Sequence, residues 1–270
     1  MTIKAVVLAR GLGTRMRRAD SGAALDLEQG RLADQGIKAM IPVGRPFLDY
    51  VLSGLADAGY DDIGLVIGPE HDVIRDRYTR DLAPTRFRLT FVIQPEPRGT
   101  AHAVTFLEQF AGGERFVVMN GDNYYPVEAL AALRALHQPG LPAFSRNALV
   151  ADGIIPPERI ARFALLDIGP DGYLRRIVEK PTEEQVASFG ADPFVSMNCW
   201  NFGPEIFPAC REVPASPRGE FEIPVAVQWG MDHYGLRLRA LPFHLAVLDL
   251  SQRADVAGVK ERLQGITVRL

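Results

Sequence analysis

The first residues that could bind a ligand or take part in catalysis form a glycine-containing turn directly after a short apolar run. The run Ala5–Leu8 predicts a buried strand, and Gly11 and Gly13 follow it closely. Glycines leave backbone N–H groups open to an approaching anion, because no side chain covers them. Thr14 and Arg15 close the turn, and the Arg15 guanidinium is a permanent cation whose shape matches phosphate oxygens. Backbone donors beside a guanidinium favour a triphosphate site at the end of this strand.

The same turn also fits a purely structural role. It has Met16 where the dinucleotide-binding fingerprint has its third glycine, and it lacks the Gly-Lys-Ser/Thr ending of a P-loop. On this segment alone, a strand-to-loop turn that uses glycine for its geometry is as good an interpretation as a phosphate site. Other polar clusters along the chain must decide between the two.

A carboxylate follows a second apolar run. Phe116–Met119 predicts a strand, and Asn120, Gly121, Asp122 and Asn123 come directly after it. Because Mg²⁺ is held by one or two carboxylates together with substrate phosphates, Asp122 is a candidate metal ligand. The alternative is an aspartate that only caps the next turn or helix, and the segment alone favours that alternative.

A stiff loop presents a side-chain amide. Gln94 follows the strand predicted at Leu89–Ile93, two prolines stiffen the residues after it, and Gly99 and Thr100 begin a helix. A glutamine offers a donor and an acceptor together, which suits the edge of a nucleotide base. The alternative is an exposed glutamine before an ordinary helix N-cap at Thr100.

Two opposite charges stand side by side at another strand end. Glu179 and Lys180 follow the strand predicted at Leu174–Val178, and Pro181 ends its hydrogen-bond ladder. Because adjacent strand residues point to opposite faces, one of the two is expected to face a pocket. The alternative is a solvated ion pair, which is common on protein surfaces.

These clusters need elements that bring them together, and the first half of the chain alternates strand-like and helix-like segments. The predicted strands are Ala5–Leu8, Asp62–Ile67, Leu89–Ile93 and Phe116–Met119, and the predicted helices are Phe47–Ala58, His71–Tyr78, Thr100–Phe110 and Val127–His137. This alternation predicts an α/β fold with a mixed, mostly parallel sheet flanked by helices. Ligands bind such sheets outside the carboxyl ends of the strands, where the glycine turn, Asp122 and Gln94 lie.

The second half is richer in strands and has longer, proline-rich connections. The predicted elements are strands at Phe163–Ile168, Leu174–Val178, Phe194–Phe202 and Leu236–Phe243 and a terminal helix at Val256–Leu263. We expect a single domain over 1–270, with a nucleotide-binding half at 1–140 and a β-rich, acceptor-binding half at 141–270.

The composition is that of an ordinary globular protein, with 47% hydrophobic and 23% charged residues in 270. A net charge of −3 argues against a surface that coats nucleic acid. Cys199 and Cys210 lack metal-ligand spacing and are expected to be reduced core thiols. The N-terminal apolar run is too short to span a bilayer and lacks the features of a secretory signal. We therefore expect no membrane association and a cytoplasmic location.

Taken together, the clusters resemble the sugar-1-phosphate nucleotidyltransferase family, and most closely its thymidylyl- and uridylyltransferases. The matching segments follow the family's order over nearly the whole chain: Gly11 to Arg15, Lys38 to Val43, Gln94 to Ala103, Gly121 to Asn123, Glu179 to Pro181, Arg218 to Ile223, and Asp249. One such motif is weak, whereas an ordered series is specific. The resemblance implies a Rossmann-like fold of the GT-A type.

The resemblance also implies a reaction and its residues. A sugar 1-phosphate-like acceptor attacks the α-phosphorus of an NTP, with UTP or dTTP favoured, and pyrophosphate leaves in a reaction that depends on Mg²⁺. The implied catalytic residues are Arg15, Lys38, Asp122 and Lys180, and the implied metal ligands are Asp122 and Asp249. The implied nucleotide-binding residues are Leu8, Ala9, Arg10, Gly11, Gly13, Thr14, Gln94, Gly99 and Thr100. The implied acceptor-binding residues are Asn123, Glu179, Lys180, Asn198, Trp200 and Arg218.

Three departures from the family pattern stand out. Arg10 replaces a small residue and adds a second cation to the turn beside Arg15, either for phosphate or for closing a loop. The segment 16–37 is longer than the family's link, and Ala24–Glu28 suggests a short extra helix there, either a lid or acceptor-side wall or a solvated insertion. Phe163 and Trp200 stand where the family has glycines near the sugar, so they either fill the acceptor pocket or belong to the core.

Two other functions stay open on the sequence. One is a cytidylyltransferase for a non-sugar phosphate such as phosphocholine, and the other is a non-catalytic homologue that binds a sugar nucleotide and regulates a partner. The presence of Arg15, Asp122, Lys180 and Asp249 argues against loss of catalysis. A homo-oligomer is compatible with the sequence.

Overall fold

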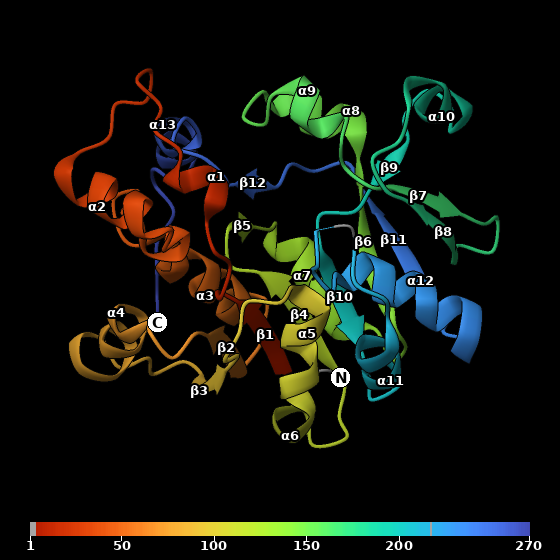
Figure 1. Cartoon of the computed structure of the whole chain (residues 1–270), viewed down its shortest axis with the longest axis horizontal. Helices are drawn as coiled ribbons and strands as arrows, with labels where there is room; N and C mark the ends of the chain where they lie inside the picture. Colours follow the sequence, from red (N-terminus) through yellow and green to blue (C-terminus); the bar gives the residue numbers. More distant parts are fainter. Residues whose placement is uncertain (1–3, 217) are drawn as a thin grey trace.

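Parallel pairing of four strands builds one half of the central sheet. The computed structural model describes residues 4–216 and 218–270 (Figure 1). The four strands are β1 (Lys4–Leu8), β2 (Asp62–Ile67), β3 (Arg88–Ile93) and β4 (Phe116–Asn120). β1 lies between β2 and β4, and β3 pairs with β2. The register pairs Leu8 with Asn120, so the carboxyl ends of β1 and β4 lie side by side.

Antiparallel pairs extend this sheet through the rest of the chain. The added strands are β6 (Gly140–Ser145), β7 (Leu165–Ile168), β8 (Leu174–Val178), β9 (Phe194–Val195), β10 (Cys199–Phe202) and β11 (Arg239–Phe243). Within the described residues, ten strands form one sheet in the order β3-β2-β1-β4-β10-β6-β9-β7-β8, with β11 parallel to β6. A separate ribbon joins β5 (Asn123–Tyr124) to β12 (Leu248–Asp249). The predicted mixed, mostly parallel sheet is confirmed, with its continuous parallel block in the first half.

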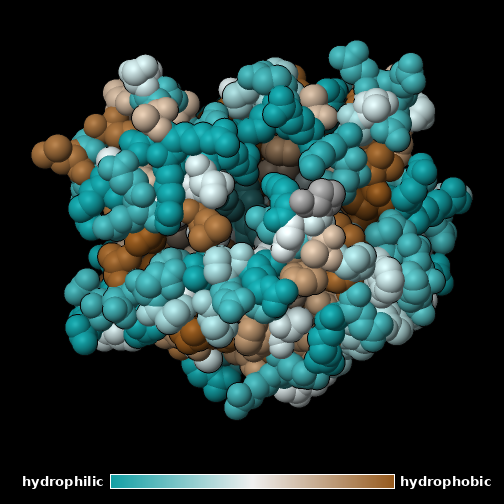
Figure 2. All heavy atoms as spheres, in the orientation of Figure 1, coloured by the Kyte–Doolittle hydropathy of each residue, from teal (hydrophilic) through white to brown (hydrophobic). Residues whose placement is uncertain are grey.

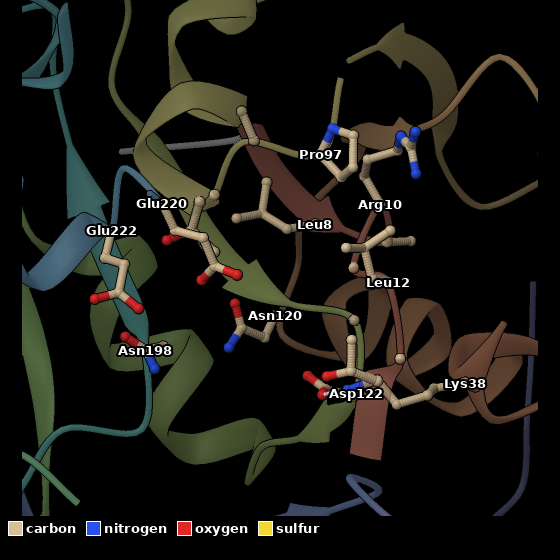
Figure 3. Close-up of a pocket in the computed structure, with 18 of the residues that line it drawn as sticks. Leu8, Arg10, Leu12, Lys38, Pro97, Asn120, Asp122, Asn198, Glu220 and Glu222 are labelled. Carbon is tan, nitrogen blue, oxygen red and sulfur yellow. Dashed lines mark hydrogen bonds and ion pairs between the residues drawn. The ribbon is translucent and has the colours of Figure 1, made fainter. Parts of the chain in front are cut away.

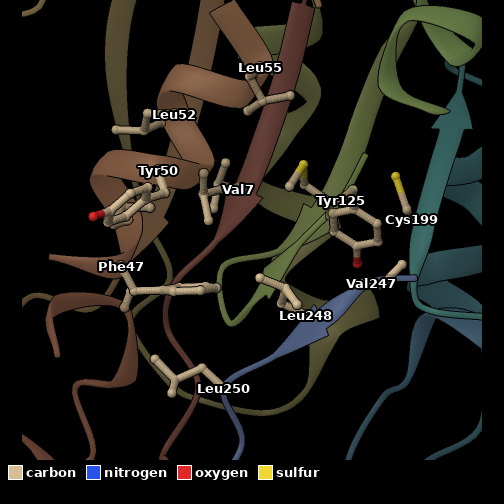
Figure 4. Packing of buried hydrophobic residues seen from close by; sticks show 14 of the residues in the cluster. Val7, Phe47, Tyr50, Leu52, Leu55, Tyr125, Cys199, Val247, Leu248 and Leu250 are labelled. Carbon is tan, nitrogen blue, oxygen red and sulfur yellow. The ribbon is translucent and has the colours of Figure 1, made fainter. Parts of the chain in front are cut away.

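Helices cover both faces because successive strand residues point to opposite sides. On β1, Ala5 and Val7 join an apolar cluster with α3 and α7, whereas Val6 joins a second cluster with α5, α11 and α12. Figure 4 shows Val7 beside Leu55 and Phe47 in the first cluster. The helices are α1 (Thr14–Arg17), α2 (Leu27–Gln35), α3 (Phe47–Asp57), α4 (Asp72–Asp76), α5 (Thr100–Val104), α6 (Glu108–Ala111), α7 (Val127–Ala135), α8 (Arg146–Asp152), α9 (Pro157–Ile160), α10 (Glu183–Ser188), α11 (Ile206–Glu212), α12 (Ile223–Tyr234) and α13 (Asp255–Arg262), with a π-helical turn at Arg77–Asp81 and 3₁₀ turns at Lys38–Met40 and Thr105–Leu107.

Most predicted elements lie within three residues of their predicted bounds. The helix suggested at Ala24–Glu28 is longer and runs from Leu27 to Gln35, and the helix predicted at His71–Tyr78 passes into a π-helical turn after Asp76. Two further predicted elements are divided in the structure. The strand predicted at Phe194–Phe202 is two strands, because Asn198 adopts a left-handed φ of 56° between them. The helix predicted at Thr100–Phe110 is interrupted by a 3₁₀ turn. β6 escaped prediction because Gly140 and Pro142 interrupt its apolar pattern. In the described ranges, no helix has the length and apolar character needed to cross a bilayer.

The long segment before Lys38 forms a packed wall. Its helix α2 begins after Asp26, later than the predicted Ala24–Glu28 start, because Asp26 and Gln29 form a capping box. The Gln29 amide also donates to the carbonyl of Pro42 at 2.7 Å. The helix ends at Gly36, whose φ of 74° is left-handed.

Replacing Phe47 by alanine tests how far the α3 contact with β1 stabilises the fold. Phe47 is fully buried, so Phe47→Ala is expected to lower the free energy of unfolding by about 3–5 kcal/mol through lost burial and a cavity. The measurement is urea denaturation. Leu27→Ala on α2 is the control, since Leu27 is 95% exposed and its truncation is expected to leave the midpoint nearly unchanged. Equal shifts for both variants would contradict this assignment of the core.

Candidate active site

A polar cavity opens at the carboxyl ends of β1 and β4. Its volume is 440 Å³, and Figure 2 shows this face of the molecule hollowed near its centre, with mostly hydrophilic residues around the hollow. Its lining includes residues of every motif segment except Asp249: Leu8, Ala9, Arg10, Gly11, Gly13, Thr14, Arg15, Lys38, Gln94, Gly99, Thr100, Asp122, Glu179, Lys180, Asn198 and Arg218. Segments far apart in sequence therefore meet in one cavity, as the order of motifs predicted.

The glycine turn is held by a backbone contact with the end of α2. Gly13 has a φ of 60°, and a Cβ built on it lies 2.4 Å from the Gly36 carbonyl oxygen. A Cβ on Gly36 lies 2.4 Å from the Leu12 carbonyl oxygen. Both positions therefore need glycine for their conformation and for space. The segment 16–37 was noted as longer than the family's link, and its helix α2 supports the turn through Gly36.

Of the two roles predicted for the Arg10 side chain, its contacts fit closing a loop rather than offering a free cation to phosphate. Its Nη1 forms an ion pair with Glu70 at 2.8 Å, and its Nε donates to the carbonyl of Gln94 at 3.2 Å. Figure 3 shows its guanidinium directed away from the middle of the cavity, where Leu8 and Asn120 lie. The physical reason is the carboxylate of Glu70, which sequence spacing gave no means to find. The backbone of Arg10 stays part of the cavity wall.

Lys38 and Asp122 form an ion pair at one end of the cavity (Figure 3). Lys38 begins a 3₁₀ turn that follows Gly36, and Asp122 lies in the tight connection between β4 and β5. Both side chains are mostly buried, so each charge needs the other. Neither motif alone predicted this direct contact.

Asp249 reaches Asp122 through the β5–β12 ribbon. The register pairs Asp249 with Asn123, and the N–H of Leu250 donates to the carbonyl of Asp122 at 2.8 Å. Burial and the nearby charge of Asp122 raise the pKa of Asp249 to about 6. Two carboxylates brought together in this way are suited to a divalent cation that also contacts phosphates. Among residues 4–216 and 218–270, no group of three His, Cys, Asp or Glu side chains forms a metal site by itself.

Two side chains outside the motifs hold Asp249 in place. Ser251 Oγ donates to Asp249 Oδ1 at 2.6 Å, and Arg159 Nη2 lies 3.6 Å from Asp249 Oδ2. Arg159 Nη1 also donates to both carboxylate oxygens of Asp255, at 2.9 and 3.0 Å. Sequence reasoning missed Arg159, which comes from the short helix α9 and has no recognisable local signal.

The amide of Gln94 is buried and has a defined orientation. Gln94 is only 2% exposed, and its Nε2 donates to the Gly99 carbonyl at 3.1 Å. The same Nε2 lies 3.1 Å from His102 Nδ1. Burial, and then Arg98, lower the pKa of His102, which favours the neutral ring that accepts this hydrogen bond. Because Nε2 has two acceptors, Oε1 is the atom left for a ligand. His102 stood in the quoted motif without an assigned role.

Gly99 and Thr100 connect this loop to the acceptor-side motif. Gly99 has a φ of 108°, and a Cβ on it lies 2.3 Å from the Phe221 carbonyl oxygen. The Thr100 hydroxyl accepts a hydrogen bond from the N–H of Ile223 at 3.0 Å. The base-side and acceptor-side segments are thus fixed to each other through their backbones.

The opposite end of the cavity carries a cluster of charges. Arg218 forms ion pairs with Glu222 and, at 3.5 Å, with Glu220. Burial, and then Glu222, raise the pKa of Glu179. Figure 3 shows Glu220, Glu222 and Asn198 across the cavity from Lys38 and Asp122. Sequence reasoning assigned no role to the two later glutamates, although they lie within the recognised motif.

Lys180 and Asn198, which line this end, have unusual backbone conformations. Their φ values of 46° and 56° make them the non-glycine residues with positive φ in the described part of the chain. Such conformations cost free energy and concentrate at functional sites. Both residues lie beside a strand, Lys180 shortly after β8 and Asn198 directly before β10.

Two residues expected to bind the acceptor lie elsewhere. Trp200 is fully buried in β10 and stacks on Phe202 with ring centroids 6.0 Å apart, so it belongs to the core and does not line the cavity. Asn123 is also buried, and its Nδ2 contacts the carbonyl of Leu248 at 3.5 Å in the β5–β12 ribbon. Phe163 packs against the core cluster as well. Strand alternation directs these side chains away from the cavity.

Comparison with known proteins gives a consistent result. A sequence model described as Nucleotidyl transferase matches residues 30–239. The UTP–glucose-1-phosphate uridylyltransferase AglF of Haloferax volcanii is 26% identical over 268 residues, which cover 99% of each chain. A glucose-1-phosphate thymidylyltransferase of Streptomyces griseus is 28% identical over 231 residues, which cover 85% of this chain and 58% of the relative. The chain likewise spans 56% of the nucleotidyltransferase Agl11 of Haloferax volcanii.

Solved structures show the same fold. A UTP-bound UGPase from Acinetobacter baumannii has a TM-score of 0.73 at 18% identity, covering 99% of this chain and 96% of its own. A UDP-glucose pyrophosphorylase complexed with UDP-glucose has a TM-score of 0.70 at 17% identity, covering 97% and 98%. At these identities the likeness establishes the fold.

Two glycine substitutions in the α2 region are expected to act in opposite directions. Gly36→Ala is expected to destabilise the protein by about 1–2 kcal/mol or more, because it adds a left-handed alanine and a clash with the Leu12 carbonyl. Gly30→Ala is expected to stabilise it by up to about 1 kcal/mol, since Gly30 is helical and has free space around it. Thermal unfolding of both variants checks this, and shifts of the same sign would contradict the role given to Gly36.

Proposed function

The chain belongs to the nucleotidyl transferase family, and we propose that it joins UTP or dTTP to a sugar 1-phosphate, giving an NDP-sugar and pyrophosphate. The observation that carries this proposal is the convergence of the motifs on one cavity. The glycine turn and Gln94 line this cavity together with the charged residues Glu179, Lys180 and Arg218. The names of the uridylyl- and thymidylyltransferase relatives support the same reaction. The proposal treats 1–140 as the nucleotide half and 141–270 as the acceptor half of one domain, acting in the cytoplasm.

In the proposed reaction, an oxygen of the acceptor phosphate attacks the α-phosphorus of the nucleotide. The bond between the α-phosphorus and the α,β-bridging oxygen breaks, and pyrophosphate leaves with that oxygen. Such chemistry depends on positioning and on neutralising charge. The turn from Leu8 to Thr14 offers backbone donors to the phosphates, and Arg15 neutralises charge on the leaving pyrophosphate. Lys38 lies between the two substrates, and Lys180 and Arg218 hold the acceptor phosphate.

Asp122 and Asp249 are the residues that we propose as ligands of Mg²⁺. The raised pKa of Asp249 reflects buried negative charge that a divalent cation would relieve, so the donor set fits. When bound, the ion neutralises phosphate oxygens at the reacting centre. Lys38 and Arg159 orient the two carboxylates from their other sides.

Gln94 is proposed to read the base. Its Oε1 accepts from a donor, and the N3–H of uracil or thymine is such a donor, whereas N3 of cytosine is an acceptor. The orientation set by Gly99 and His102 therefore favours UTP and dTTP over CTP. The hydrogen bond donated by a neutral pyrimidine contributes about 0.5–1.5 kcal/mol, and the mismatch with cytosine adds a desolvation cost.

The acceptor end favours a polyhydroxylated group. Carboxylates and amides such as Glu179, Glu220 and Asn198 accept hydrogen bonds from sugar hydroxyls. A quaternary ammonium group such as that of phosphocholine is recognised by aromatic cages. The described residues that line the cavity include no aromatic ring, which favours a sugar phosphate over phosphocholine.

The decisive experiment measures pyrophosphate release with a matrix of nucleoside triphosphates and sugar 1-phosphates in the presence of Mg²⁺. The proposal expects turnover with UTP or dTTP and at least one sugar 1-phosphate. Absence of turnover with every pair, combined with tight binding of an NDP-sugar, would replace it by a regulatory, non-catalytic role.

Removing the Arg15 guanidinium tests the charge assigned to the leaving group. Arg15→Ala is expected to slow pyrophosphate release about 10³-fold, the lower range for a cation at a transferring phosphoryl group. Its unfolding midpoint is expected to stay unchanged, because the side chain is exposed. Arg18→Ala is the control, since Arg18 is exposed and lies outside the cavity lining. Near-normal release from Arg15→Ala would refute the assigned role.

Substitutions of His102 test how the nucleotide base is selected. His102→Ala removes one acceptor from Gln94 Nε2, so the amide can rotate, and the ratio of kcat/KM for UTP over CTP is expected to fall up to about tenfold. His102→Gln keeps an acceptor and is expected to retain most of this ratio. An unchanged ratio in His102→Ala would show that Gln94 is oriented without the histidine.

A further inference from the structure

A second cavity lies behind the glycine turn. Its volume is 520 Å³, and Gly11 and Leu12 line both this cavity and the nucleotide cavity. Its other walls come from α1, α2 and the segment that leads into α4, which lie on the same side of the molecule in Figure 1. None of the roles in the proposed reaction uses this space.

Three arginines from different elements line the second cavity. Arg10 comes from the turn, Arg17 from α1 and Arg31 from α2. Arg17 Nη2 donates to the carbonyl of Gln35 at 2.7 Å, which fixes its guanidinium at the wall. Three guanidinium groups around one small space attract an anion, and most strongly a phosphate, whose oxygens match their geometry.

The carboxylates of this cavity neutralise only part of that charge. Glu70 pairs with Arg10, and Asp34 pairs with Arg253, which lies outside the lining. In the described parts of the chain, neither Arg17 nor Arg31 has a carboxylate within ion-pair distance. Burial lowers the pKa of His71, the charge of Glu70 raises it, and the charges of Arg10 and Arg17 lower it. A protein of net charge −3 thus keeps a local excess of positive charge here.

The cavity is built from two of the three departures from the family pattern described above. Arg10 replaces a small residue, and the long segment 16–37 supplies Arg17, Arg31 and the α2 wall. That wall is held in place, since Arg253 Nε donates to the carbonyl of Met16 at 3.0 Å and its guanidinium pairs with Asp34. The capping box at Asp26 fixes where α2 begins. Two departures that meet in one preformed space point to a shared purpose.

We propose that this second cavity binds a small phosphorylated anion, and that its occupancy alters nucleotide binding through the shared Gly11–Leu12 backbone. The binding part stands on the arginine geometry alone, whereas the coupling part rests on the proposed function. An anion on one side restrains the same residues that present N–H groups to the triphosphate on the other. The coupling is reciprocal, so nucleotide also changes the affinity for the anion.

Calorimetric titration of inorganic phosphate into the full chain, with saturating UDP present, tests the site. One phosphate is expected to bind, and Arg31→Ala is expected to weaken it about tenfold, as loss of a charge-assisted contact does. Arg31 is an exposed residue on α2, so this variant is expected to keep its fold and its basal turnover. Arg80→Ala, at an exposed arginine outside both cavities, is the matched control and is expected to bind phosphate like the wild type.

Three results would overturn the inference: displacement of phosphate by UDP, equal affinity in Arg31→Ala and the wild type, or no phosphate binding at all. The source of the anion follows from two further measurements. If the natural ligand is a separate effector, phosphate changes the KM for UTP in the wild type and not in Arg31→Ala. If it is the leaving pyrophosphate, Arg31→Ala also raises the inhibition constant of pyrophosphate. A KM for UTP that phosphate leaves unchanged in the wild type would reject the coupling between the two sites.

The proposed function is tested independently of this site. Turnover of UTP with a sugar 1-phosphate, without Arg31-dependent phosphate binding, leaves the proposed function standing and rejects the second site. Arg31-dependent phosphate binding without any turnover would support the second site and reject the proposed function.

Discussion

The close backbone contact between Gly13 and Gly36 is the constraint on which the candidate site depends. It fixes the turn that follows β1 against the end of α2, and it leaves no room for a side chain at either position. Lys38 follows Gly36 after one residue, so the same contact places its ammonium group beside Asp122. The two cavities lie on opposite sides of this support, which makes the turn a shared wall rather than a free loop.

Electrostatic balance is the second organising principle. Asp122 and Asp249 lie close together and partly buried, and each has a basic partner of its own, Lys38 and Arg159. A buried charge without compensation is costly, so these partners let the protein keep two carboxylates at the reacting centre. At the other end, Arg218 balances Glu220 and Glu222 in the same way. Pairing of opposite charges therefore limits the free-energy cost of gathering these charged side chains in one cavity.

Most of the fold and the gathering of the motifs could be predicted from the sequence, because both follow from local patterns. Apolar runs such as Phe116–Met119 predict buried strands, and parallel strands bring their polar ends to one edge. The errors and the open alternatives arose where a distant partner decides the outcome. The charge of Arg10 is taken by Glu70, which is distant in sequence, and strand register places Trp200 in the core and Asn123 in a ribbon. No local pattern reveals which face of a strand the rest of the chain will cover.

The β5–β12 ribbon has a consequence for the order in which the protein is made. Asp122 and Asp249 are far apart in sequence, and the pairing of these short strands brings them together. During synthesis, the nucleotide half leaves the ribosome long before Asp249 is available. Contacts between residues so far apart in sequence form late, since closing a long loop costs entropy before the contact repays it. The carboxylate pair is thus completed only after Asp249 has been translated, so a nascent chain that has not yet reached Asp249 lacks the full set of acidic groups at its reacting centre.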